Sequence, residues 1–198
     1  MNKLIQAVGV VIKQRGYTGL SIANISAEAG VDRKLISLYF ESVNNLIETY
    51  IRSKDYWVSA AVKALQMFAK TENAGSRELL ERLLLCQMDD LINDEEMQKI
   101  LLWQISEKSN IMAHVAHSQK HIYALLFPFS DKELLGKDVD LRAISAILTA
   151  GIYGLVLHAK ATESTFYGID LNTEAGMSRI KNAVTTTLEQ TYDGAKEL

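Results

Sequence analysis

Apolar residues recur along this chain every three or four positions, with polar residues between them. Leu4, Val8 and Ile12 form the first such row, and the row ends before Gly16. A spacing of three and four places these side chains on one face of an α-helix. Because glycine just after an apolar row favours the end of a helix, the pattern predicts a first helix that stops at Gly16.

Three further helix starts follow within the first quarter of the chain. Ser21 precedes a short row that ends at Gly30, and Asp32 precedes a second short row. Serine and aspartate favour helix starts because their side-chain oxygens accept hydrogen bonds from free backbone N–H groups. Ser42 begins a fourth predicted helix, whose apolar row continues to about Lys70. The N-terminal segment is therefore predicted to hold three short helices and the start of a long one.

The remainder of the chain carries the same helical spacing. No segment alternates apolar and polar residues with a period of two, so we predict no strands and an all-α fold. Pro128 is expected to stop a helix, because proline lacks the backbone N–H that a helix interior requires. The expected helices cover the run LLERLLLCQMDDLI, Asp94 to Trp103, about Asn110 to Phe127, about Val139 to Ala161, and about Thr173 to Tyr192.

The composition is that of a helical globular protein, with 48% hydrophobic residues, 23% charged residues and a single proline. Cys86 is the single cysteine and cannot form an intrachain disulfide, so we expect a cytoplasmic protein. The most apolar run, Ala143 to Leu157, is shorter than the roughly 20 residues that a membrane span needs. We therefore expect a helix buried on more than one side and no membrane partner.

Positive charge is concentrated near the N-terminus. The formal net charge is −3, yet residues 1–52 hold six lysines and arginines against four aspartates and glutamates. The second and third predicted helices, joined by a short turn that contains glycine, form the pattern of a helix-turn-helix. In that motif the second helix enters the major groove of DNA. Charge and pattern together indicate that the third predicted helix binds an anionic partner.

The third predicted helix has two faces at 100° per residue. Ile36, Tyr39 and Phe40 lie on one side, where we expect them to pack on the first two helices. A helix start with basic side chains suits phosphates and base edges, because the helix dipole and the charges both attract anions. A solvated surface helix would show the same spacing. The opposite side carries Lys34, Ser37 and Leu38, with Arg33 and Leu35 at its edges.

The segment RGYTGLSIANISAEAGVDRKLISLYFESVNNLI resembles the N-terminal DNA-binding domain of TetR-family transcriptional regulators. The matching features are Arg-Gly-Tyr after the first helix, the turn from Ile25 through Ala29, Gly30 and Val31, and Tyr39-Phe40 followed by Ser42 and Leu46. The resemblance implies a helix-turn-helix DNA-binding domain at 1–45 and a helical effector-binding and dimerisation domain at 46–198. It also implies a homodimeric repressor on a palindromic double-stranded DNA operator, with no enzyme activity and no cofactor. The candidate DNA-contacting residues are Ser21, Asn24, Arg33, Lys34, Leu35, Ser37, Leu38 and Tyr39.

The chain departs from the usual pattern of that family at several positions. Family members commonly carry a tyrosine in place of Ser37, a histidine or similar residue in place of Leu38, and a phosphate-gripping lysine in place of Val43. The basic arm that usually precedes the first helix is reduced to Lys3. Fewer phosphate contacts imply weaker and less salt-sensitive DNA binding. A TetR-like small-molecule-binding protein with weak or lost DNA binding is therefore the alternative hypothesis.

The resemblance assigns an unknown small-molecule effector and the dimer contact to the rest of the chain. Methionine and aromatic side chains adapt to irregular apolar ligands, although most such residues belong to the core. The dimer is expected to form through the helices near 139–161 and 173–192, where Ala146, Ala150, Gly151 and Gly154 allow close approach of helices. The candidate effector contacts are Trp57, Met67, Met88, Met97, Trp103, Met112, His117, His121, Tyr123 and Phe127.

Three histidines share a face of the helix expected at 110–127. They are His114, His117 and His121, and the last two have the i, i+4 spacing of metal ligands. No carboxylate or thiol lies in the same segment to complete a site. Surface histidines or polar lining of an effector site are the favoured interpretation, and no metal is predicted. A histidine-based metal sensor or a helical enzyme is the less favoured alternative.

Overall fold

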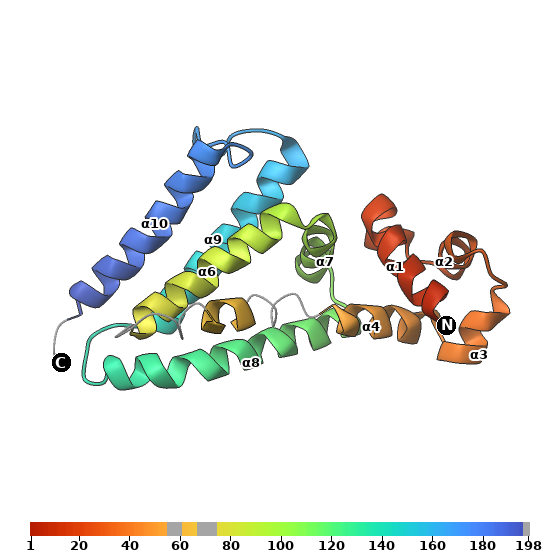
Figure 1. The fold of residues 1–198 in the computed structure, drawn as a ribbon, viewed down its shortest axis with the longest axis horizontal. Helices are drawn as coiled ribbons and strands as arrows, with labels where there is room; N and C mark the ends of the chain where they lie inside the picture. Colours follow the sequence, from red (N-terminus) through yellow and green to blue (C-terminus); the bar gives the residue numbers. More distant parts are fainter. Residues whose placement is uncertain (55–60, 67–74, 196–198) are drawn as a thin grey trace. The chain divides into compact units, whose positions relative to one another are not determined.

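A computed structural model describes residues 1–54, 61–66 and 75–195 of the chain. Within those ranges the protein is helical and contains no strand, which confirms the all-α prediction. One short connection contains a 3-10 turn, η1 (Tyr17–Gly19), and another contains an isolated bridge between Phe166 and Ile169. The helices are α1 (Asn2–Arg15), α2 (Ile22–Ala29), α3 (Lys34–Phe40), α4 (Val43–Ser53), α6 (Ser76–Asn93), α7 (Glu95–Ser106), α8 (Asn110–Glu133), α9 (Leu141–Thr162) and α10 (Glu174–Asp193), as Figure 1 shows.

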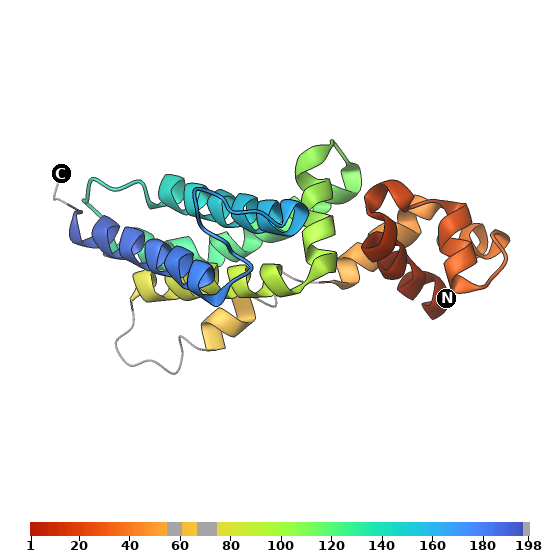
Figure 2. The same ribbon diagram turned by 90° about the horizontal axis from the view of Figure 1, so that it is seen from above.

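The chain forms two compact units. The first unit contains Met1–Tyr56 together with Asp94–Gln119, and so joins α1 to α4 with α7 and the beginning of α8. The second unit contains Trp57–Asn93 together with Lys120–Leu198. In the second unit α6 packs against both α9 and α10 (Figure 1 and Figure 2).

Side-chain caps set the helix boundaries in the first unit. The Ser21 hydroxyl oxygen accepts a hydrogen bond from the backbone N–H of Asn24 at 3.2 Å, and Gly30 ends α2 in the left-handed conformation with φ 64°. Asp32 lies two residues before α3, and its carboxylate accepts from the backbone N–H of Lys34 at 2.8 Å. These are the oxygen acceptors and the glycine that the sequence predicts at these boundaries.

The fourth helix is shorter than the sequence predicts. α4 begins after its cap Ser42 but ends at Ser53, well before Lys70. Two local bonds close its last turn: the Ser53 hydroxyl donates to the Tyr50 carbonyl at 2.7 Å, and the Lys54 N–H donates to the Ile51 carbonyl at 3.1 Å. Such bonds satisfy the free carbonyls at a helix end, so the helix can stop although apolar spacing continues beyond it. Residues 61–66 are helical again.

Pro128 lies inside α8, so the prediction that it stops this helix is wrong. Proline removes one helical hydrogen bond, and neighbouring contacts hold the following turn in place. The Ser130 hydroxyl donates to the Phe127 carbonyl at 3.0 Å. From α9, the Arg142 guanidinium lies 4.6 Å from the centre of the Phe127 ring and donates two bonds to Asp131 at 2.7 and 2.6 Å.

α9 lies close to its predicted position but is less buried than the sequence predicts. It covers 22 residues, which is enough to cross a membrane by length and composition alone, but one such helix is weak evidence for a membrane span. Its buried residues lie three, four or seven apart and therefore form one row. The prediction of burial on more than one side is wrong for the single chain, because the other side of α9 is exposed. The buried row contains Leu141, Ser145, Ile152, Val156 and Ala159.

Candidate nucleic-acid interface

The short helix α3 buries one row of side chains and exposes the rest. Ile36 and Phe40, one turn apart, are 0% and 8% exposed, whereas Leu38 is 70% exposed. Tyr39 is 50% exposed, so the prediction that it packs inward with Ile36 and Phe40 is wrong. Tyr39 is offset from the row formed by residues one turn apart, and its ring therefore stays accessible.

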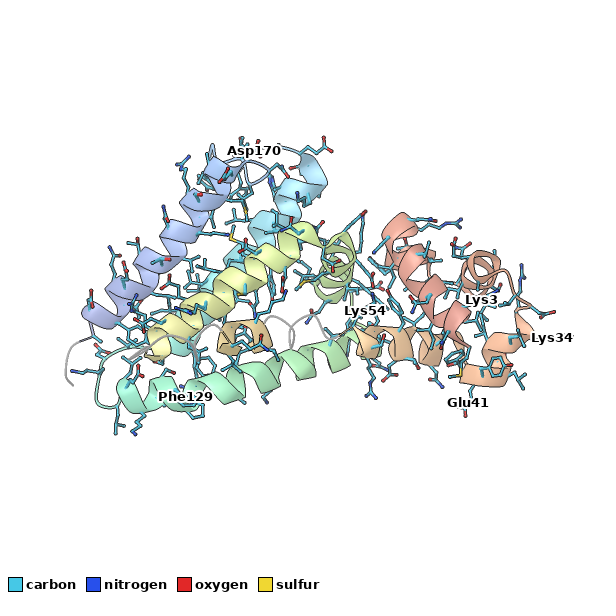
Figure 3. All side chains as sticks on the ribbon, in the orientation of Figure 1. Lys3, Lys34, Glu41, Lys54, Phe129 and Asp170 are labelled. Carbon is cyan, nitrogen blue, oxygen red and sulfur yellow. The ribbon has the colours of Figure 1, made fainter. Side chains whose placement is uncertain are left out.

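Basic and polar side chains gather on the outward side of α3. Arg33, Lys34 and Ser37 are exposed, and Leu35 is half-buried at the edge. Lys34 points away from the other helices of the first unit (Figure 3). The backbone N–H of Lys34 is already bonded to Asp32, so this N–H is not free for an anion. Side chains, rather than this end of the backbone, therefore present the donors.

An open groove runs beside this cationic start of α3. It lies between α2 and α3 and includes the glycine turn. Because Arg33 and Lys34 lie on its edge, an extended anion in the groove meets both positive charges. The groove is lined by Ala23, Ser26, Ala27, Gly30, Val31, Asp32, Arg33 and Lys34.

Two candidate residues on α2 have different roles in the structure. Ser21 caps α2 through its oxygen, which leaves its hydroxyl hydrogen able to donate to a phosphate. The Asn24 amide donates to the Gly19 carbonyl at 2.8 Å and accepts from the Arg15 guanidinium at 2.8 Å. Asn24 therefore ties α2 to the end of α1 and to the connection between them.

Tyr50 on α4 is a buried tyrosine that links helices of the unit that carries the candidate interface. The sequence pattern did not predict this contact. Tyr50 is 2% exposed, and its hydroxyl donates to the Glu96 carboxylate on α7. A Cβ atom at Gly9 of α1 would lie 1.9 Å from the Tyr50 hydroxyl oxygen, so only glycine leaves room for this contact. Burial, followed by the bond to Glu96 and its charge, raises the pKa of Tyr50 above its ordinary value.

Glu96 joins three helices of the first unit. Its side chain is 3% exposed, and its carboxylate lies 3.4 Å from the Lys13 ammonium of α1 and 3.5 Å from the Lys54 ammonium at the end of α4. A second contact links Tyr17 of η1 to Trp103 of α7, with parallel rings 5.7 Å apart. In the sequence Glu96 follows Asp94 and Glu95 and so resembles an ordinary acidic helix start. No local pattern distinguishes its buried role.

The candidate effector contacts are divided between the two units. Met97, Trp103 and Met112 are buried in the first unit, and Met88 is buried in the second. Tyr123 and Phe127, both in the second unit, stack with ring centres 6.0 Å apart.

The remaining effector and metal candidates lie outside the described part of the chain. These are Trp57, Met67 and the side chains of His114, His117 and His121. Among the described residues, no group of three or more histidines, cysteines and carboxylates could hold a metal ion.

Comparison with known proteins agrees with this geometry. A family model described as "Bacterial regulatory proteins, tetR family" matches residues 4–49, the segment from α1 into α4. The HTH-type transcriptional regulator BetI of Proteus mirabilis (strain HI4320) is 42% identical over 60 residues. These matches identify the N-terminal segment of the chain as that of a TetR-family regulator. The match to BetI spans 30% of this chain and 30% of that protein.

Solved structures of bacterial transcriptional regulators share the fold over nearly the whole chain. A putative TetR-family transcriptional regulator from Rhodococcus sp. has a TM-score of 0.67 at 15% identity, covering 96% of this chain and 97% of that one. The regulator FadR from Bacillus subtilis, in complex with stearoyl-CoA, has a TM-score of 0.66 at 16% identity, covering 94% and 96%. At such low identity these similarities show the fold alone.

Proposed function

We propose that this TetR-family protein is a ligand-responsive repressor that binds a palindromic operator in the cytoplasm as a homodimer. The outward side of α3 is the observation that carries the proposal. It presents Arg33, Lys34 and Ser37 to solvent on a helix whose other side is anchored by Ile36 and Phe40. A helix fixed in this way, with cations at its start, suits the major groove of DNA.

Each exposed side chain has a matching group on the duplex. Arg33 and Lys34 suit phosphates or the acceptor edge of guanine, and Leu38 suits a thymine methyl group. Ser21 and Ser37 suit phosphate or base edges as hydroxyl donors. Asn24 acts as a positioning residue, because its amide is bonded within the first unit.

Equilibrium titration of DNA tests the DNA-binding part of the proposal. Wild-type protein, Lys34→Ala and Lys108→Ala are titrated into labelled DNA from the region upstream of the gene, at about 50 and about 200 mM salt. Lys108 is the matched control, because it is an exposed lysine of the first unit outside the α2–α3 surface.

Wild type and Lys108→Ala are expected to bind the upstream DNA in preference to scrambled DNA. Lys34→Ala is expected to bind more weakly and to lose about one unit of the slope of log affinity against log salt. Absence of sequence-specific binding by the wild type would favour the alternative, a small-molecule-binding protein that has lost DNA recognition.

The exposed side of α9 supports the homodimer. Ala146, Ile147, Ala150, Gly151 and Gly154 recur at helical spacing and are all exposed, with Ile147 at 71%. A Cβ atom at Gly151 or Gly154 would meet nothing within 4 Å, so the chain's own packing does not require glycine there. Close approach of a helix from a second copy explains both the small residues and their exposure. We propose that α9 and α10 form this contact.

We propose that the effector binds in the second unit and acts on DNA affinity through α4 and α7. The FadR structure with stearoyl-CoA shows that a protein of this fold binds an acyl ligand. In this chain α7 follows α6 directly, and Glu96 ties α7 to α1 and α4. A displacement of α6 would therefore be passed to α7 and, through the contacts of Glu96, to α1 and α4. We expect a coupling free energy of about 1 to 3 kcal/mol between effector binding and DNA binding.

A further inference from the structure

Gln87 is a buried side chain with unused hydrogen-bonding capacity. It lies on α6 in the second unit and is 1% exposed. Neither its amide nitrogen nor its amide oxygen has a hydrogen-bond partner in the described part of the protein. Burial of an unpaired polar group costs stability, so a residue of this kind requires an explanation.

The other buried polar side chains of the second unit are satisfied by the protein. Ser76 bonds to Glu133 and Tyr192, Ser130 to the Phe127 carbonyl, and Ser145 to the Leu141 carbonyl. Among the described residues of this unit, no charged side chain is buried. Gln87 is therefore the one buried polar group there that is available to a ligand within the described ranges.

The buried neighbours of Gln87 on α6 are apolar. Leu83, Leu84, Met88 and Leu91 lie within about one turn of it and are all buried. An apolar molecule in this region gains contact with leucine and methionine side chains. A polar group on that molecule meets Gln87.

We infer that Gln87 is the polar anchor of the effector, and that the effector is an apolar molecule with a neutral head that both donates and accepts a hydrogen bond. A carboxamide or a protonated carboxyl group has this chemistry, since it pairs with the nitrogen and the oxygen of a glutamine amide together. A charged head finds no buried counter-charge among the described residues of the second unit. The inference rests on the proposed ligand response and names the chemistry of its ligand.

An unpaired Gln87 should lower the stability of the ligand-free protein. Gln87→Met keeps the approximate size of the side chain and removes the two unpaired groups, so it should stabilise the protein without ligand. The same substitution should weaken binding of the ligand. A residue that served packing alone would not produce these two opposite effects.

Thermal unfolding of the full chain at fixed protein concentration tests the inference. Wild type, Gln87→Met and the control Gln14→Met, at an exposed glutamine on α1, are each heated alone, with decanamide and with decylammonium chloride. Decanamide joins an apolar chain to a neutral donor–acceptor head, and decylammonium carries a charge on a chain of the same length. Titration of decanamide gives its Kd for each protein.

Without ligand, Gln87→Met is expected to raise Tm by about 2 °C or more relative to wild type, and Gln14→Met is expected to leave it nearly unchanged. Decanamide should raise the Tm of wild type and of Gln14→Met, and it should bind Gln87→Met about tenfold more weakly than wild type. Decylammonium should not raise the Tm of wild type or of Gln14→Met. A fall in Tm for Gln87→Met without ligand would show that Gln87 is paired and would overturn the inference. Equal binding of decanamide to wild type and Gln87→Met, stronger stabilisation by decylammonium, or no stabilisation of wild type by decanamide would also overturn it.

These outcomes are separate from failure of the proposed function. Operator binding is measured on ligand-free protein by the DNA titration. A protein that binds decanamide through Gln87 but no specific DNA would retain the ligand site and lose the proposed repressor role. A protein that binds specific DNA, but whose ligand binding does not depend on Gln87, would retain the proposed repressor role and lose the ligand site at Gln87.

Discussion

Gly9 and Tyr50 show how a single contact can fix the relation of two helices. The Tyr50 hydroxyl occupies the space that a Cβ atom at position 9 would need, at a distance of 1.9 Å. Replacement of Gly9 by alanine must therefore move Tyr50 from the Glu96 carboxylate or separate α1 from α4. Either change loses packing or a buried hydrogen bond.

Gly9→Ala is expected to lower the free energy of unfolding by about 1 to 3 kcal/mol, although alanine favours helices. Chemical denaturation followed by circular dichroism measures this change. An equal or higher midpoint would mean that α1 and α4 do not need this close approach.

Cys86 has an environment that suppresses its reactivity. Burial raises the pKa of the Cys86 thiol, and the neighbouring carboxylates of Asp90 and Asp89 raise it further. The thiolate is the reactive form, so a raised pKa leaves less of it near neutral pH. We expect iodoacetamide to alkylate folded protein more slowly than unfolded protein at neutral pH, with a rate that rises through alkaline pH. Mass spectrometry over a time course measures both rates, and equal rates would contradict this environment.

At the scale of elements, the helix caps could be predicted from the sequence. The continuation of α8 through Pro128 could not. Ser21, Ser42 and Thr173 each accept a bond from the backbone three residues later, and a short polar side chain before an apolar row is visible in the sequence. Pro128 also has a clear local meaning, but Arg142 on a different helix helps to hold the turn after it. The sequence shows the break and does not show which distant residue compensates for it.

The contacts of helix α7 show that sequence patterns predict only part of the candidate site. The exposed start of α3 follows from local spacing, because Arg33 and Lys34 adjoin a recognisable turn. Glu96 contacts Tyr50 from 46 positions away, and nothing in the pattern near either residue pairs them. Long-range contacts of this kind depend on the packing of whole helices.

Two substitutions of Glu96 are expected to differ in stability. Glu96→Gln retains an acceptor for Tyr50, and the partly exposed Lys13 and Lys54 can turn to solvent, so the cost should be at most about 1 kcal/mol. Glu96→Ala leaves the buried Tyr50 hydroxyl without that acceptor and should cost at least about 2 kcal/mol. Urea denaturation of both variants gives the order. A larger loss for Glu96→Gln than for Glu96→Ala would show that charge, rather than the bond to Tyr50, dominates this contact.

At the scale of the whole molecule, the proposal requires two copies of the chain. Ile147→Glu places a charge on the exposed small-residue side of α9 and is expected to raise the dimer dissociation constant at least about tenfold. Leu135→Glu is the control, since Leu135 is 83% exposed in the connection between α8 and α9. Sedimentation equilibrium measures both constants. Equal association of Ile147→Glu and wild type would exclude this side of α9 as the dimer contact.

The most direct test of the central claim is a hydroxyl-radical footprint of the wild-type protein on its upstream DNA. Two copies of α3 on a symmetric operator are expected to protect two half-sites about one turn of DNA apart, roughly 34 Å from centre to centre. Ile147→Glu at the same concentration should lose both protected regions together. Protection of one half-site alone, or no protection where the wild type is fully dimeric, would contradict the account of this chain as a dimeric operator-binding repressor.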